Sequence, residues 1–394
     1  VEDQTVQIIF PPIYLAYMAA VLEQEGWQCR IFDAPAAGLT WKDYQRALEE
    51  FDPSLLVLGV TLPTLEQDSR AAEMAKATCP DIMTVARGEI FLTEDQPALE
   101  RMPALDVVIR GESETAIGEI GQGLPLESIK GLTFRRDGEM VRTPNRPHLE
   151  DLDQLPYPAR HLLDNSLYVS PESRRPLTGI QANRGCPSRC IFCPAWTFSG
   201  RRVRVRSPEN ILGEIRQCVE QFGLREFYFN ADTFTYHKQW TIDLCRAIAA
   251  SGLDIRWGCN SRVDTIDAER LEWMKKAGCW VIGFGIESGS EESLRNMGKE
   301  TTLEQAEQAV RLCKEAGIRV HTFFVFGFPW EDRSHIEKTV SFARRLDPDF
   351  FDFNIATPLP GTTLWGMVRR EGLIERSDGS YAQAAVRTSH LSAE

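Results

Sequence analysis

The chain has 394 residues, of which 43% are hydrophobic and 26% charged. At about 150 residues per domain this length suits two or three domains, and the composition excludes a disordered, collagen-like or coiled-coil protein. The 44 basic and 57 acidic residues give a net charge of −13, which disfavours a protein that coats DNA or RNA. No apolar stretch approaches the roughly 20 residues of a transmembrane helix, and no signal-peptide pattern is visible. We therefore expect a cytoplasmic protein, incomplete at its Met-less start and at its weakly patterned end.

The first 119 residues alternate β-branched runs with amphipathic helical patterns. Pro11 and Pro12 mark the start of the first helix, and Gly26 marks its end. Strands are predicted at 5–10, 28–32, 54–60, 82–86 and 105–109. This alternation favours an α/β fold with a doubly wound, flavodoxin-like parallel sheet in a domain of residues 1–125. In such sheets ligands bind beyond the carboxyl ends of the strands. The candidate residues there are Thr61, Pro63, Thr64, Arg87, Gly88, Glu89, Gly111 and Glu112.

Residues 126–176 are predicted to form a small β-hairpin appendage and a linker. Asp137-Gly138 is a strong hairpin turn signal between strands at 129–135 and 139–142. The following stretch contains six prolines and little periodicity, which is typical of an ordered connector.

The strand and helix alternation resumes in the second half of the chain. Six consecutive units predict an open or partial (β/α)6 TIM-like barrel over residues 177–360, followed by a C-terminal extension at 361–394. Its active site should lie at the carboxyl ends of the strands. The predicted strands are 177–182, 226–229, 255–258, 280–286, 319–326 and 350–355, and the predicted helices are 208–222, 239–250, 268–277, 303–316 and 335–345.

Three of the ten cysteines, Cys186, Cys190 and Cys193, lie together directly after the first strand of the second domain. The other seven are scattered through apolar patterns, so we expect free thiols in a reducing cytoplasm and a metal site at the trio. Thiols spaced by three and two residues can surround an iron–sulfur cube and leave its fourth iron open. The alternative is a structural zinc site, which needs a fourth ligand, and the nearest candidates are His161 and Cys218.

This CxxxCxxC motif at the mouth of a six-unit barrel, with Phe192 inside it, resembles the radical S-adenosylmethionine (SAM) superfamily. The resemblance implies one 4Fe–4S cluster on Cys186, Cys190 and Cys193, with SAM bound to the open iron. It also implies that an external one-electron donor, of flavodoxin or ferredoxin type, reduces the cluster. SAM is then cleaved to a 5′-deoxyadenosyl radical that abstracts hydrogen.

Other strand ends match positions that bind SAM in this superfamily. Gly285-Ile286-Glu287-Ser288 resembles a segment that contacts its ribose or methionine moiety, and the segment around Gly327 resembles one that packs against adenine. The Gly-Gly-Glu of many relatives is absent. The residues implied as cofactor contacts are Phe192, Asn230, Asp232, Arg262, Glu287, Ser288 and Gly327. For Glu287 and Arg262 the alternative is a salt bridge across the barrel mouth.

Two further predictions concern residues near the trio. Cys218, Cys245 and Cys313 fall on outer helices, with Cys259 and Cys279 near opposite ends of their strands, so we predict a single cluster. Arg202, Arg204 and Arg206 alternate with valines. They form either a solvated edge strand or a face that meets an anionic substrate or phosphate.

A doubly wound domain ahead of such a barrel resembles the cobalamin-binding radical SAM subfamily, across nearly the whole chain. The matching stretches include residues 11–22, 52–61 and 106–115. No histidine occurs before His148, so this Rossmann-like domain would give cobalt no His ligand. One of two glycines common in relatives is replaced, since the chain reads Arg87-Gly88-Glu89. The alternative is a degenerate domain kept for structure or partner docking.

The resemblance favours an enzyme that methylates an unactivated carbon of a small-molecule or lipid-like substrate, with methylcobalamin as methyl donor. One alternative keeps the radical and omits methyl transfer, as in anaerobic porphyrin cyclases or hopanoid-associated relatives. Methylthiolation of tRNA would need more clustered cysteines and a basic appendage. A non-catalytic cobalamin or redox sensor is the alternative from another class.

Overall fold

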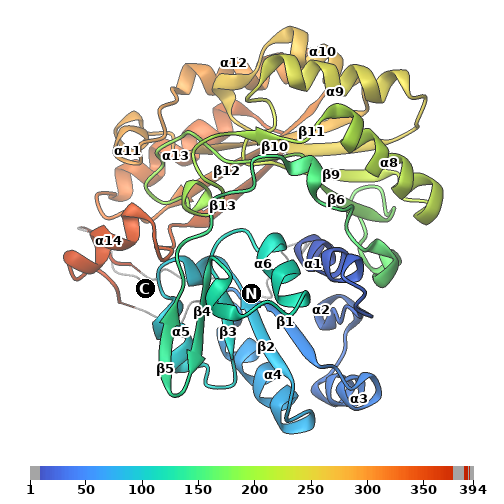
Figure 1. Ribbon diagram of the computed structural model, residues 1–394. Coiled ribbons are helices and arrows are strands. Elements are labelled where there is room, and N and C mark those ends of the chain that lie inside the picture. Colours follow the sequence, from blue (N-terminus) through green and yellow to red (C-terminus); the bar gives the residue numbers. More distant parts are fainter. Residues whose placement is uncertain (1–8, 376–385, 389, 391–394) are drawn as a thin grey trace. The chain divides into compact units, whose positions relative to one another are not determined.

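The computed structural model describes residues 9–375, 386–388 and 390. The chain divides into two compact units (Figure 1). Unit 1 comprises Val1–Glu150 and Gln154–Pro176, and unit 2 comprises Asp151–Asp153 and Leu177–Glu394. The connector that the sequence predicts between the domains thus groups mostly with unit 1.

Unit 1 is built on a five-stranded sheet in the order β1-β2-β3-β4-β5. Strands β1 (Leu55–Gly59), β2 (Met83–Arg87) and β3 (Val107–Ile109) are parallel, which confirms three predicted strands. The predicted hairpin is also present, as β4 (Leu132–Arg136) and β5 (Glu139–Arg142). Because β4 pairs antiparallel with β3, the hairpin continues the sheet and is not a separate appendage.

Two predicted strands of this domain have a different outcome. Residues 28–32 form no strand, so that prediction is wrong. In a doubly wound sheet a strand at 28–32 would pair with the first strand of the domain, and the described residues include no strand in that position. The predicted strand at 5–10 lies mostly outside the described residues, and Ile9 and Phe10 are not in a strand.

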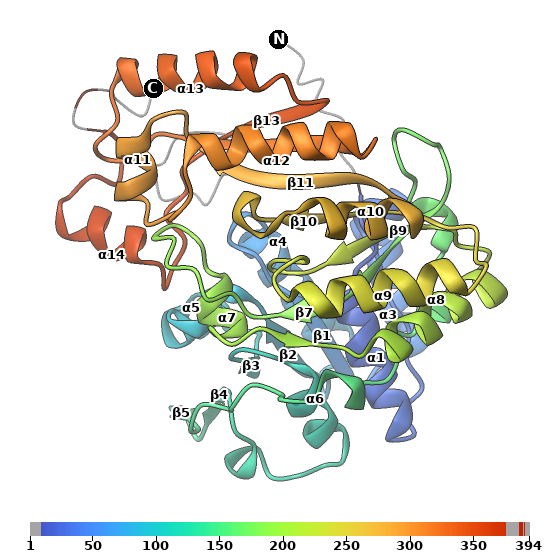
Figure 2. The same ribbon diagram turned by 90° about the horizontal axis from the view of Figure 1, so that it is seen from above.

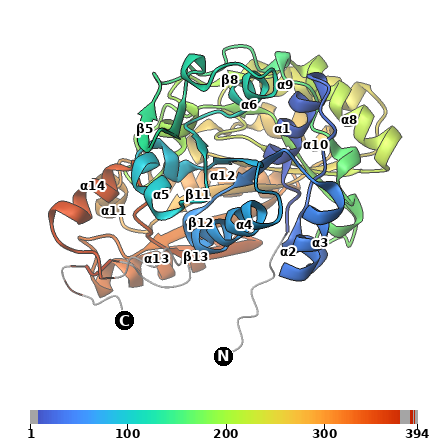
Figure 3. The same ribbon diagram turned by 60° about the horizontal axis from the view of Figure 1, so that its bottom comes forward.

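Helices cover both faces of this sheet (Figure 3), which confirms the doubly wound arrangement. Met18 and Ile117, from α1 and α6, pack with Val107 and Ile109 on one face. Residues of α4 and α5 pack with Ala86 and Val108 on the other face. The helices of unit 1 are α1 (Ile13–Gln24), α2 (Ala34–Ala37), α3 (Trp41–Phe51), α4 (Leu65–Thr78), α5 (Asp95–Arg101) and α6 (Glu114–Gly121).

Gly88 sits where the ends of two neighbouring strands approach closely. A Cβ atom added there would lie 2.1 Å from the carbonyl oxygen of Val60. We expect Gly88→Ala to destabilise unit 1 by about 1–3 kcal/mol, because the backbone must shift to relieve this overlap. Gly59→Ala is the matched control, since its added Cβ meets only Leu15, at 3.9 Å. Equal denaturation midpoints for the two variants in urea would contradict this reading.

Unit 2 contains a parallel six-stranded sheet in the order β13-β12-β11-β10-β9-β6. All six predicted strands are confirmed, and together they form the partial barrel. Their carboxyl ends lie at one edge, so loops from different parts of the chain meet there. The strands are β6 (Leu177–Gln181), β9 (Glu226–Asn230), β10 (Arg256–Ser261), β11 (Cys279–Glu287), β12 (Arg319–Phe326) and β13 (Phe350–Ile355).

Five helices of unit 2 pack on the outer face of the sheet (Figure 2), around a core that includes Phe229, Trp257 and Phe284. Helix α8 begins after the Ser207 cap and ends at Gly223, whose φ of 66° suits glycine. The five predicted helices correspond to α8 (Pro208–Phe222), α9 (Lys238–Ala250), α10 (Ala268–Lys276), α12 (Leu303–Glu315) and α13 (Arg333–Leu346). The sequence did not indicate α7 (Ala195–Ser199), α11 (Glu291–Asn296), α14 (Thr363–Arg370) or β7 (Asn183–Arg184). Strand β7 pairs with β8 (Arg204–Val205), which lies in the arginine–valine stretch predicted as an edge strand. No helix in the described residues is long and apolar enough to cross a membrane.

Candidate functional site

The three clustered cysteines lie in the loop between β7 and α7, at the carboxyl end of β6; we call residues 185–194 the cysteine loop. Cys190 is buried, and Cys186 and Cys193 are half-buried. The loop is anchored to the barrel, since the Ile191 amide donates to the Met297 carbonyl over 2.9 Å. Gly185 has a φ of 102°, and a Cβ there would lie 2.1 Å from the Arg202 carbonyl oxygen, so only glycine fits.

Asp232, beyond the end of β9, fixes the start of this loop. Its carboxylate accepts a hydrogen bond from the Gly185 amide over 2.6 Å. Asn183 supports the same turn, because its side chain bonds the Asp232 amide at 3.2 Å and the Thr233 carbonyl at 3.0 Å. The structure thus brings Asp232 to the cysteine loop, whereas the half-buried Asn230 is placed by its backbone carbonyl, which accepts from the Ala182 amide.

Electrostatics at the thiols combine burial with nearby positive charge. Burial raises the pKa of Cys193 to about 12. Burial also raises the pKa of Cys190, while Lys299 and Arg262 act in the opposite direction. A bound metal cation favours the thiolate form of cysteine, as Lys299 and Arg262 do at Cys190. The three thiols are therefore suited to ligate a metal cluster.

Lys299 and Glu287 form a buried ion pair at the end of β11, with 2.7 Å between Nζ and Oε1. Their side chains are only 8% and 9% exposed. Burial acts to lower the pKa of Lys299, but Glu287 and Cys190 outweigh it and the pKa is raised. Glu287 also adopts a φ of 70°, in the left-handed region that non-glycine residues rarely occupy. Sequence reasoning missed Lys299.

Arg262 belongs to the same group of side chains. Its guanidinium binds Asp264 through two contacts of 2.9 Å and donates to the Lys299 carbonyl over 3.0 Å. As the alternative expected, Arg262 and Glu287 both form ion pairs, but with Asp264 and Lys299 and not with each other. The sequence pattern did not indicate that Asp264 and Lys299 would be the partners of Arg262 and Glu287.

The remaining candidates of unit 2 are held within the fold. The buried Ser288 hydroxyl lies 3.1 Å from that of Thr339 on α13. The Gly327 amide donates to Glu331 over 2.9 Å at the end of β12. Phe192 packs edge-on against Phe328, with ring centroids 5.6 Å apart.

The candidates of unit 1 follow the carboxyl ends of three neighbouring parallel strands, so the structure brings them to one sheet edge. The hydroxyls of Thr61 and Thr64 lie 2.7 Å apart in the turn that contains Pro63. Arg87 lies over the Tyr14 ring, with 5.0 Å to its centroid. The other candidates lie on the two loops that follow β2 and β3. Gly88 directly precedes the turn that starts at Glu89, and Gly111 has a φ of 87°. The Glu112 carboxylate accepts a hydrogen bond from the Leu149 amide over 2.9 Å.

Two other groups of residues differ from their predictions. Arg204 and Arg206 are buried rather than on a solvated edge or an open anion site. Arg206 pairs with the buried Glu214 and donates to the Gln181 carbonyl over 2.9 Å. Cys259 lies next to Cys279, contrary to the expected separation, and after burial it is the main influence that raises the pKa of Cys279.

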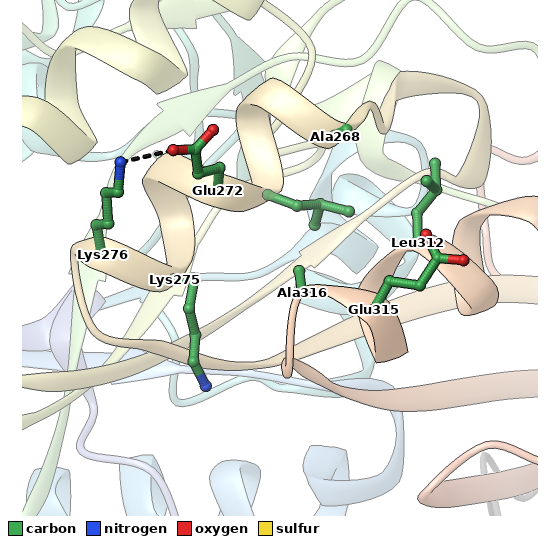
Figure 4. Close-up of a pocket in the computed structure, with 8 residues that line it drawn as sticks. Ala268, Glu272, Lys275, Lys276, Leu312, Glu315 and Ala316 are labelled. Carbon is green, nitrogen blue, oxygen red and sulfur yellow. Dashed lines mark hydrogen bonds and ion pairs between the residues drawn. The ribbon is translucent and has the colours of Figure 1, made fainter.

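Two further observations bear on where a ligand could bind. Within residues 9–375, 386–388 and 390, no three His, Cys, Asp or Glu side chains are arranged to hold a single metal ion. A surface groove of about 360 Å³ lies between α10 and α12 (Figure 4), on the outer helical layer and away from the cysteine loop. Its lining includes the Glu272–Lys276 pair, and it is no part of the candidate site.

The comparisons with known proteins agree with this geometry. The sequence family described as the Radical SAM superfamily matches residues 180–343, and that described as the B12 binding domain matches residues 4–121. A protein of Pyrococcus horikoshii, described as an uncharacterized methyltransferase, is 34% identical over 359 residues, which covers 90% of this chain and 78% of that protein. The chain belongs to the cobalamin-binding radical SAM enzymes.

Other members of this enzyme family carry different descriptions. The anaerobic magnesium-protoporphyrin IX monomethyl ester cyclase of Rubrivivax gelatinosus is 29% identical over 367 residues, which covers 90% of this chain and 66% of the cyclase. The chain thus spans just under two thirds of that relative. The solved structure of the methyltransferase TsrM from Kitasatospora setae, with cobalamin and a [4Fe–4S] cluster, gives a TM-score of 0.77 at 20% identity, covering 92% of this chain and 72% of TsrM. That of OxsB, with aqua-cobalamin and SAM, gives 0.80 at 19% identity, covering 97% and 62%. At these identities the structures show the shared fold.

The cofactors of this cobalamin-binding radical SAM enzyme are accordingly a 4Fe–4S cluster, SAM and cobalamin. Sequence reasoning had reached the family and all three cofactors.

Proposed function

We propose that this enzyme transfers a methyl group to an unactivated carbon of a small-molecule or lipid-like substrate. The observation that carries the proposal is the cysteine loop at the carboxyl ends of the barrel strands, in a chain that also has a B12 binding domain. When bound, the cluster and SAM supply the radical, and cobalamin supplies the methyl group. We place the activity in a reducing cytoplasm, because the ten cysteines show no paired framework.

The residues of unit 2 would divide the work as follows. Cys186, Cys190 and Cys193 would ligate three irons and leave one for SAM. Glu287 and Arg262 would orient SAM, and Lys299 would hold the Glu287 carboxylate in place through the 2.7 Å contact. Asp232 would fix the loop by its bond to the Gly185 amide.

In unit 1, the loops after β1, β2 and β3 would hold cobalamin. The Thr61 and Thr64 hydroxyls are exposed there, and nothing lies within 4 Å of the Cβ position of Gly111, so the edge leaves room for a ligand. Residues 1–147 contain no histidine, so this part of the chain would give the cobalt no imidazole ligand.

Metal analysis after anaerobic purification and reconstitution tests this assignment. We expect about four irons and one cobalt per chain, and formation of 5′-deoxyadenosine from SAM once a reductant is added. Iron without cobalt would reduce unit 1 to a scaffold and remove methyl transfer. Zinc in place of iron would overturn the radical reading.

A second candidate is ring formation or rearrangement without methyl transfer. It is favoured by the 29% identity to the Rubrivivax gelatinosus cyclase. The two candidates differ in the product, because methylation adds a CH₂ unit to the substrate mass. Reductive cleavage of SAM would exclude a non-catalytic sensor.

A further inference from the structure

Positive charge is concentrated around the cysteine loop of an otherwise acidic chain. Residues 184–206 include six arginines and no acidic residue, whereas the whole chain has a net charge of −13. Arg184, Arg204 and Arg206 are buried. Arg189, Arg201 and Arg202 are exposed. The buried three serve the fold, and the exposed ones face solvent near the thiols.

Arg189 lies within the cysteine loop itself, one residue before Cys190. Its backbone approaches Gly298 closely, since the carbonyl oxygen is 2.9 Å from where a Cβ of Gly298 would lie. The described residues include no ion-pair partner for its guanidinium, so the positive charge of this side chain faces solvent.

Arg201 approaches the same stretch from the other side of the loop. Its Nη1 lies 3.5 Å from the Pro187 carbonyl oxygen and 3.4 Å from that of Ser188. Its guanidinium stacks on Trp196 of α7, with 4.5 Å to the ring centroid. None of these contacts neutralises the charge, and no acidic side chain among the described residues pairs with it.

We propose that Arg189, Arg201 and Trp196 form the docking surface for a small acidic one-electron donor of the flavodoxin class. The inference rests on the proposed function, in which one electron must enter the cluster. The reduced flavin loses this electron and the cluster gains it, and no atom is transferred. An acidic carrier is repelled by most of this chain and attracted to these cations, which orients its approach to the thiols. Arginine and tryptophan are also the side chains enriched in protein interfaces.

The test compares two double variants of equal charge. Arg189→Glu/Arg201→Glu reverses the proposed surface, and Arg46→Glu/Arg311→Glu makes the same net change on α3 and α12. The probe is a purified bacterial flavodoxin. Its Kd is measured by calorimetry at low and high salt, and 5′-deoxyadenosine formation is driven by reduced flavodoxin or by dithionite.

We expect the first variant to bind flavodoxin at least about tenfold more weakly at low salt, with a smaller salt dependence than wild type. Its rate of 5′-deoxyadenosine formation should fall more with reduced flavodoxin than with dithionite, and the control variant should bind flavodoxin like wild type. The neutral variant Arg189→Gln/Arg201→Gln should bind flavodoxin with a Kd between those of the charge-reversal and control variants. It takes the place of the charge-reversal variant if that variant does not fold.

Two outcomes separate this inference from the proposed function. Equal flavodoxin binding by the surface and control variants would overturn the docking surface and leave the radical chemistry intact. A wild-type protein that cleaves no SAM with either reductant would overturn the proposed function, while the calorimetric Kd values would still decide where flavodoxin binds.

Discussion

Cys190→Ala is expected to lose most of the bound iron and to reduce 5′-deoxyadenosine formation by at least about a thousandfold. Cys190 is the central thiol of the trio and is only 7% exposed, so no water-borne ligand easily replaces it. Burial raises the pKa of this thiol, and the nearby cations Lys299 and Arg262 act to lower it. With the thiol gone, the cluster has only two protein ligands.

The matched control for this prediction is Cys218→Ala. Cys218 is fully buried on α8, in the core between helices and sheet. Cys218→Ala removes buried contacts in the core but leaves the cysteine loop unchanged. Iron content and 5′-deoxyadenosine formation should therefore remain at wild-type levels. Iron and sulfide analysis with an absorbance spectrum provides the measurement. Retention of about four irons by Cys190→Ala would show that the cluster has other ligands.

Lys299→Met is expected to cost about 3–5 kcal/mol of stability in unit 2, the largest effect we predict for a single side chain outside the cysteines. The substitution leaves an unbranched side chain one atom shorter than lysine and removes the partner of Glu287. The carboxylate would then be buried and unpaired next to a backbone held at a φ of 70°. An isolated buried charge is far more costly than a buried pair.

The double variant Glu287→Gln/Lys299→Met separates charge from packing. It removes both charges, so it should recover much of the lost stability, although SAM binding should stay impaired because Glu287 is the proposed SAM contact. Urea denaturation followed by circular dichroism gives the stabilities. If Lys299→Met unfolds at the wild-type urea concentration, the pair does not hold the end of β11 in place.

Sequence patterns predicted the parts of this protein that depend on local spacing. The six strands of the barrel follow from their apolar runs, and the cysteine loop follows from three thiols with gaps of three and two residues. Glu287 was predicted as a SAM contact because it stands at a strand end in a segment that resembles one of the radical SAM superfamily. Each of these signals lies within about ten residues of chain.

Features that depend on distant partners were not predictable in this way. Lys299 follows the short helix α11 with no pattern that marks a buried lysine, and only the fold brings it to Glu287. Arg204 and Arg206 alternate with valine as an exposed edge strand would, and burial becomes evident only through partners such as Glu214 on α8. The hairpin of β4 and β5 was placed correctly in the chain, but its pairing with β3 is a tertiary contact.

The central claim, methyl transfer through cobalamin, can be tested without knowledge of the substrate. Reduced protein loaded with iron, sulfide and cobalamin is incubated with SAM that carries a CD₃ group, and the extracted cobalamin is analysed by mass spectrometry. We expect bound cobalamin to acquire the CD₃ group, up to about one per chain. Cobalamin that stays bound and unmethylated while 5′-deoxyadenosine forms would contradict methyl transfer and favour the cyclase-like chemistry.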